Sequence, residues 1–287
     1  MSSEITTAFV EQYSSNVSML AQQMGSRLRA AVDVENIVGK NGFFDQVGVT
    51  AAVQRTSRHA DTPQIDTPHS RRRLSLSSYE WADLIDDQDK VRMLIDPTSS
   101  YAKAAAAAMG RAMDDVIISA ALGTAFTGET GSTSTAFSSD NQIANGSADM
   151  SVAKLRQAKK LLDLADVDPS IPRYIAVGPN QVEALLGDTN VTSSDFNTVK
   201  ALVQGDVDTF MGFKFIVTNR LSVASNIRSC FAWAEDGIAL GIGKDVSARI
   251  DERADKGYAT QVYYCMSVGA TRMEESKIVQ IDCDESA

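Results

Sequence analysis

Histidine and cysteine are scarce in this chain of 287 residues. The two histidines, His59 and His69, lie in one short polar stretch, so the usual proton acceptor for a Ser or Cys nucleophile is absent elsewhere. Cys230, Cys265 and Cys283 are odd in number and widely spaced, which indicates neither a disulfide framework nor a metal-ligand spacing. We therefore expect no catalytic residue, no cofactor and no metal site, and a reducing cytoplasm fits the cysteine usage.

Long hydrophobic runs and positive charge are also in short supply. No stretch approaches the roughly 18 apolar residues that a membrane span needs. Residues 1–12 lack a basic region followed by an apolar run, so no secretory signal is expected. Lys and Arg number 27 against 37 Asp and Glu, a net charge of -10, so phosphate backbones repel the chain as a whole. Sequence-specific nucleic-acid binding is therefore not expected.

What is present is typical of a folded protein, with 44% hydrophobic and 22% charged residues. The length allows either one large domain or two lobes. Residues 4–24 place apolar side chains at spacings of three and four, which predicts an amphipathic helix. This helix either lies across a neighbouring subunit as an arm or docks on its own core.

The polar stretch 48–79 is predicted to form a long two-stranded hairpin. Pro63 and Pro68, set among Asp and Thr, mark its tip. Strands of about ten residues would extend roughly 30 Å. Because an isolated ribbon is marginally stable in water, a partner chain is expected to stabilise it.

The two histidines could face each other across this stretch as paired polar side chains or, less favourably, as a metal site. Arginines also concentrate here. Arg71, Arg72 and Arg73 are predicted to lie opposite Arg55 and Arg58. They form either a nucleic-acid patch or, more in keeping with an acidic chain, contacts to carboxylates of a neighbouring copy. The predicted inter-subunit contacts are Arg55, Arg58, Arg71, Arg72, Arg73, Asp61 and Asp66.

An alanine-rich helix is the strongest element that the sequence predicts. Asp96 and Pro97 supply an N-cap and a first-turn proline, residues 98–122 form the helix, and Gly123 ends it. Its length, roughly 37 Å at 1.5 Å per residue, indicates a central spine.

The remainder alternates between helices and strands, after a Gly/Ser/Thr-rich loop or loose hairpin at 124–149. This pattern predicts an α/β lobe followed by strands. Helices are expected at 152–165, 179–186 and 195–204, and strands at 173–177, 213–219, 232–242, 246–251, 259–268 and 277–281.

Two further patterns have weak claims to chemistry. The glycine-rich run 237–244 has Ile238 and Asp245 where a phosphate-binding loop needs glycine and a hydroxyl, so a plain strand and turn is favoured. Carboxylates cluster in three places, where they are expected to be solvated or to form salt bridges. The clusters are Asp86, Asp87 and Asp89, then Asp114 and Asp115, then Asp282, Asp284 and Glu285.

The order of arm, hairpin, spine helix, α/β lobe and strands resembles that of the major capsid proteins of tailed bacteriophages. Three phrases carry the resemblance, which is closest to podophage-type coat proteins. They are RMLIDPTSSY at 92–101, VGPNQVEALL at 177–186 and GFKFIVTNRL at 212–221.

The resemblance implies an α+β tailed-phage capsid fold, which herpesvirus capsid floors and encapsulins share. Its parts would be an N-terminal arm at 1–46, an extended loop at 47–90, a peripheral domain at 91–123 and 235–287, and an axial domain at 124–234. Some members of this family crosslink through a lysine. The absence of lysine between Lys40 and Lys90 makes such a bond through the loop doubtful.

The function so implied is a non-enzymatic capsid subunit of the virion. It would self-assemble in the host cytoplasm, as pentamers and hexamers, into an icosahedral shell around double-stranded DNA, with scaffold and portal proteins as further partners and no membrane. The alternatives are an encapsulin-like compartment that holds a protein cargo and, less favoured, a soluble α/β enzyme.

Overall fold

The computed structural model describes residues 22–59, 61–62, 64–85, 98–187 and 209–286, which fold as two compact units. The smaller unit includes residues 78–112 and 244–266, and the larger includes 27–77, 113–243 and 267–286. No helix among these residues is long and apolar enough to cross a membrane.

A mixed sheet forms the centre of the larger unit. Its middle strand β12 (Ile227–Ala234) pairs antiparallel with both β15 (Ile278–Asp284) and β8 (Arg173–Val177). Strand β10 (Phe213–Val217) lies next to β8 and runs parallel to it. The outer strands are β7 (Gln142–Ile143), β9 (Thr209–Phe210) and β11 (Val223–Ala224).

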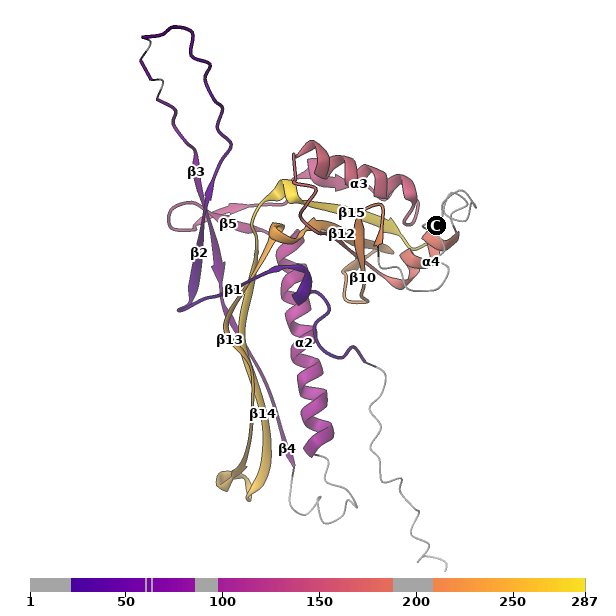
Figure 1. Ribbon diagram of the computed structural model, residues 1–287. Helices are drawn as coiled ribbons and strands as arrows, with labels where there is room; N and C mark the ends of the chain where they lie inside the picture. The colour runs from indigo at the N-terminus through magenta and orange to yellow at the C-terminus, as the bar shows by residue number, and fades with distance from the viewer. Residues whose placement is uncertain (1–21, 60, 63, 86–97, 188–208, 287) are drawn as a thin grey trace, which may run out of the picture. The chain divides into compact units, whose positions relative to one another are not determined.

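The core of the larger unit is packed around β12. Trp233 is fully buried, stacks on Tyr174 and donates its indole N–H to the carbonyl of Ala31 at 2.8 Å. Helix α3 (Val152–Leu164) covers the sheet over β15 with Leu155 and Leu162 buried (Figure 1). Helix α4 (Pro179–Gly187) follows β8. Buried positions recur on α3 at helical spacings, which is why the sequence predicted a helix there.

A second sheet in this unit contains β2 (Asn41–Val47), β3 (His69–Ser75), β5 (Ala125–Thr127) and β6 (Thr133–Thr135), in that order. All three pairings are antiparallel. This sheet holds the arginine-rich strand β3 between two partners.

The third sheet has the order β1-β13-β14-β4, and its two central strands each contribute residues to both units. The 3-10 turn Ala254–Lys256 and Gly257, which has a positive φ of 64°, connect the long strands β13 and β14. The strands are β1 (Asp33–Asn36), β13 (Ile238–Arg253), β14 (Ala259–Arg272) and β4 (Ser77–Ile85).

Helix α2 (Thr98–Leu122) is the predicted spine, with the predicted bounds. Ala105, Met109, Met113 and Ile117 recur every fourth residue and are all buried, so one face of the helix packs along its length. In the smaller unit, a Cβ at Gly110 would collide with the backbone of Gly25, so the absence of a side chain lets the N-terminal chain cross the helix in contact.

The C-terminal end of α2 is held by the guanidinium of Arg272, whose side chain is fully buried. Nη1 donates to the carbonyls of Ala121 at 3.1 Å and Gly123 at 2.7 Å, and Nη2 donates to that of Thr135 at 3.3 Å. The last carbonyls of a helix lack partners within the helix, so a cation there satisfies them.

Most of the predicted elements are confirmed, including α2, α3, α4, β8 and β10. The predicted strand 232–242 is wrong, because the 3-10 turn Glu235–Gly237 divides it into β12 and β13. The strand predicted at 246–251 is part of β13. The predicted helices 4–24 and 195–204, and the cap at Asp96 and Pro97, lie at least in part outside the described residues.

The spine provides a stability prediction. Replacing Ala106, at an exposed mid-helix position, with proline removes a backbone hydrogen bond and clashes with the preceding turn, at a cost of about 3 kcal/mol or more. We expect Ala106→Pro to leave little soluble, cooperatively unfolding subunit, while Ala106→Ser behaves like the wild type. Circular dichroism during thermal unfolding measures both, and a cooperative Ala106→Pro transition near the wild-type Tm would contradict the expectation.

Candidate assembly surface

The segment 48–68, between β2 and β3, is the most exposed internal stretch that the structure describes. Gly48 donates its N–H to the carbonyl of Pro68 at 2.8 Å, and the described residues between them form no helix or strand. Val49 is 97% exposed, Val53 59% and Ile65 45%. A hairpin is present, but the prediction of its strands is wrong: the paired strands are β2 and β3, of seven residues each, and the first of them ends before the predicted hairpin begins.

Arg71 forms a bidentate ion pair with Asp45 directly across the ribbon. Nε lies 2.5 Å from Oδ1 and Nη2 lies 3.2 Å from Oδ2. The hydrogen bond and the charge of Arg71 lower the pKa of Asp45 below its usual value. This pair is exposed, so solvent screens it and its contribution to stability is small.

Arg72 points to the other side of β3, toward the turn between β14 and β15. Its Nε donates to the carbonyl of Met273 at 2.9 Å, and Nη2 lies 4.0 Å from Glu275. Gln46 on the neighbouring strand donates to the same carbonyl at 2.8 Å. The side chain of Arg72 is only 12% exposed, so these bonds fasten the ribbon to the body of the larger unit.

Arg73 contacts β5, the strand that pairs with β3 on the side away from β2. Its guanidinium lies 4.7 Å from the ring centroid of Phe126 on β5, within the range of a cation–π interaction. Its side chain also packs so closely on Gly131 that a Cβ there would clash. Arg71, Arg72 and Arg73 thus all have partners within the chain, which the sequence prediction of neighbour contacts did not include.

The predicted register of the arginines is wrong. Arg71, Arg72 and Arg73 lie opposite Asp45, Phe44 and Phe43, not opposite Arg55 and Arg58. Strand β2, NGFFDQV at 41–47, has no apolar–polar alternation in its sequence that would have located this partner, although its burial alternates in the structure.

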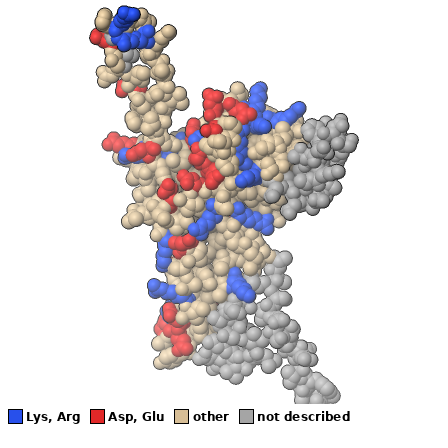
Figure 2. All heavy atoms as spheres, in the orientation of Figure 1, with Lys and Arg blue, Asp and Glu red and all other residues tan. Residues whose placement is uncertain are grey.

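The remaining charged candidates lie in the exposed segment itself. Arg55 and Arg58 lie close together, because Arg55 donates to the backbone carbonyl of Ser57 at 2.8 Å and to that of Arg58. Figure 2 shows Lys and Arg atoms gathered at the tip of this segment. Asp61 and Asp66 are exposed as well. These four residues, like Arg71, Arg72 and Arg73, stay predicted inter-subunit contacts.

The two histidines are not a facing pair, because His69 lies opposite Val47 in the register while His59 belongs to the tip. In the part of the chain that the structure describes, no three His, Cys, Asp or Glu side chains are grouped so that they could hold a metal ion. The glycine-rich run 237–244 is mostly β13, a strand without the loop and helix that cradle a phosphate.

The carboxylate clusters in the described residues have partners within the chain, but Asp114 differs from the expectation. Asp114 is fully buried, whereas solvation or a salt bridge was expected; it accepts the backbone N–H groups of Arg27 at 3.1 Å and Leu28 at 3.2 Å. Asp115, on a different face of α2, forms the expected ion pair with Arg220. Glu285 pairs with Arg228, and Asp86, Asp87 and Asp89 lie outside the described residues.

Solved capsid structures share this fold from end to end. The capsid of the cyanophage P-SCSP1u is similar with a TM-score of 0.74 at 15% identity, covering 97% of this chain and 94% of that one. The capsid of Ralstonia phage GP4 has a TM-score of 0.75 at 11% identity, covering 96% and 94%. The capsid of a native GTA particle has a TM-score of 0.72 at 13% identity, covering 99% of both chains. The architecture is that of a phage capsid subunit.

Sequence comparison then defines the family. Residues 5–285 match the model of the family described as phage capsid protein, so the chain belongs to that family. No curated protein matches the chain. The chain is a tailed-phage major capsid protein, a structural and non-enzymatic component of the virion that associates with copies of itself into a shell.

The different partners of Arg71 and Arg72 provide a matched pair of variants. We expect Arg72→Met to lower the free energy of unfolding by about 1–3 kcal/mol, because the Met273 carbonyl loses a partly buried charged donor. Arg71→Met should have a much smaller effect, because its ion pair is screened by solvent. Urea unfolding of the two purified subunits measures the difference, and equal losses would show that the contact with Met273 does not fasten the ribbon.

Proposed function

We propose that this subunit forms pentamers and hexamers that close into an icosahedral shell around double-stranded DNA, and that the segment 48–68 lies against a neighbouring copy. The observation that carries the proposal is the exposure of Val49, Val53 and Ile65 in a segment whose described residues form no helix or strand. Assembly in the host cytoplasm, with scaffold and portal proteins, belongs to the same proposal.

An exposed segment loses conformational entropy when it becomes ordered. Fixing a backbone residue costs roughly 1–2 kcal/mol in conformational entropy, which burial must offset. The segment buries little within its own chain, so its ordered form gains stability only when another surface covers it. Apolar residues interspersed with Arg55, Arg58, Asp61 and Asp66 suit such a surface, since apolar contacts supply affinity and charges fix the register.

The proposed division of the chain follows the same logic. The arm at 1–46 and the loop at 47–90 would reach over neighbours. The peripheral domain at 91–123 and 235–287 and the axial domain at 124–234 would form the body. That β2 lies within 41–47 and joins β3 supports a loop that begins directly after a structured ribbon.

Replacing Val49, Val53 and Ile65 together with serine tests the role of the segment. Each side chain is already exposed, so we expect the Tm of the isolated subunit to change by no more than about 2 °C. Particle formation should fall strongly, because the apolar contact is lost at every copy in the shell. Negative-stain electron microscopy and sedimentation measure particle yield.

Val38 is a matched control, because it is 100% exposed but lies in the turn between β1 and β2. Val38→Ser should assemble at the wild-type yield. If the triple variant also assembles at that yield, residues 48–68 do not contact neighbours through these side chains. If it fails to fold, the segment belongs to the core of the subunit.

The charge of the chain provides a test of the container role. With a net charge of -10, the purified subunit should bind duplex DNA weakly at physiological salt, because counterion release gives little gain to an acidic surface. A mobility-shift titration should show no complex below about 10 µM, well short of specific binding. Submicromolar binding would mean that the subunit holds DNA directly and does not simply enclose it.

A further inference from the structure

One face of α3 carries three cations that the fold does not use. Arg156, Lys159 and Lys160 are exposed, and among the described residues no carboxylate pairs with any of them. Lys154 on the same helix shows the contrast: it is buried, and its ammonium donates to the carbonyls of Ala148 at 2.7 Å and Asp282 at 2.8 Å. The three exposed cations therefore add positive charge to the surface, not stability to the core.

The carboxylate nearest to these cations along the helix is already occupied. Asp163 accepts a hydrogen bond from Nη1 of Arg173 at 2.6 Å, and the Arg173 side chain is 8% exposed. Asp163 is half-exposed, but Arg173 already balances its charge, so the pair adds no net negative charge beside the lysines one turn away. The surface keeps a local excess of positive charge on a chain of net charge -10.

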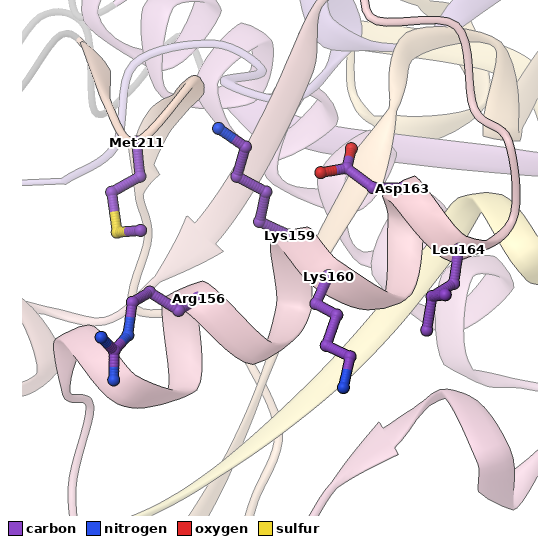
Figure 3. A pocket seen from close by; sticks show the side chains of 6 residues that line it. All are labelled: Arg156, Lys159, Lys160, Asp163, Leu164 and Met211. Carbon is purple, nitrogen blue, oxygen red and sulfur yellow. The ribbon is translucent and has the colours of Figure 1, made fainter.

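A hollow of about 350 Å³ lies beside this face. Figure 3 shows the side chains that line it, which are Met211, from the turn between β9 and β10, and five residues along α3: Arg156, Lys159, Lys160, Asp163 and Leu164. Met211 supplies an apolar wall, and Leu164 is 70% exposed. A hollow of this size admits one or two side chains, whereas the rod of duplex DNA needs a broad surface.

We propose that this basic face of α3, formed by Arg156, Lys159 and Lys160, is a contact surface that receives carboxylates of a second copy of the chain. Self-association is established by the family, and an acidic subunit must bring like-charged copies together. Cations at spacings of three and four on a helix can engage several carboxylates of a neighbour at once. The proposal rests on the shell-forming function and specifies which surface attracts the next copy.

The first test uses wild-type subunits. Particles, or oligomers of any size, are formed from an equal mixture of ¹⁴N- and ¹⁵N-labelled chains and treated with a carbodiimide, which joins lysine amines directly to carboxylates. We expect mass spectrometry to find crosslinked peptides that contain Lys159 or Lys160 and carry one label of each kind. Crosslinks at these lysines that are only within one chain, or none, would overturn the proposal.

The second test reverses the charge of the face. Lys159→Glu with Lys160→Glu should lower particle yield roughly tenfold, since each weak contact is lost at every copy. Lys159→Arg with Lys160→Arg should keep the wild-type yield. Lys40→Glu with Lys103→Glu, both exposed and elsewhere in the chain, is the control with the same change in net charge and should lower the yield less than twofold.

The remaining outcomes are decisive as well. Wild-type yield for the Lys159→Glu, Lys160→Glu variant overturns the proposal, and normal shells that hold less DNA would identify nucleic acid as the partner instead. If that variant does not fold, the crosslinks of the wild-type chain decide the question. The proposed function and this contact fail in distinguishable ways. If wild-type chains form no closed particles, the proposed function fails, and crosslinks that carry both isotope labels in smaller oligomers still show the contact.

Discussion

The buried guanidinium of Arg272 is the contact on which the arrangement of the larger unit depends. It lies at the end of β14, yet it binds carbonyls at the end of α2 and the carbonyl of Thr135 at the end of β6, and its guanidinium lies 5.1 Å from the ring centroid of Phe137. Burial lowers the pKa of Arg272, while the nearby Glu275 carboxylate raises it. Because a buried cation without acceptors is strongly unfavourable, each element that supplies a carbonyl must be in place for the others to be stable. One residue thus fixes a helix end, a strand end and a hairpin together.

In the same unit, the arginines of β3 stabilise the fold, whereas the segment 48–68 is exposed and is proposed to contact other copies of the chain. Arg71, Arg72 and Arg73 are consecutive, but their side chains contact Asp45, the Met273 carbonyl and Phe126, so β3 is fastened on both sides. The segment 48–68, which directly precedes that strand in the chain, has exposed valines, and its described residues form no helix or strand. A paired ribbon that carries an exposed segment suits recognition of a partner, since the ribbon fixes both ends of the segment and so limits the entropy lost on binding.

The sequence was sufficient to predict elements whose signal is local. Helix α2 was predicted to the residue, because alanines, a proline start and a glycine end all act within one segment. Strand register was not predictable from local patterns, since it depends on residues distant in the chain: Arg71 pairs with Asp45 because β2 precedes the stretch that looked like the hairpin. Asp114 likewise has the sequence context of a surface acid, and its burial depends on the backbone N–H groups of Arg27 and Leu28, which are distant in the chain. The division at Glu235–Gly237 was missed because the run on both sides is uniformly apolar.

Charge sets the remaining constraint on assembly. Copies of a chain with a net charge of -10 repel one another over about 8 Å at physiological ionic strength, and places where cations are gathered reduce that repulsion. In the described residues such gatherings occur at the tip that holds Arg55 and Arg58, and on α3 at Arg156, Lys159 and Lys160. Each exposed pair is weak, which lets a misplaced copy dissociate, whereas a closed shell repeats every pair at each subunit and becomes stable as a whole. Weak attraction at a few cationic places on an acidic surface is therefore consistent with a shell that becomes stable only as a whole.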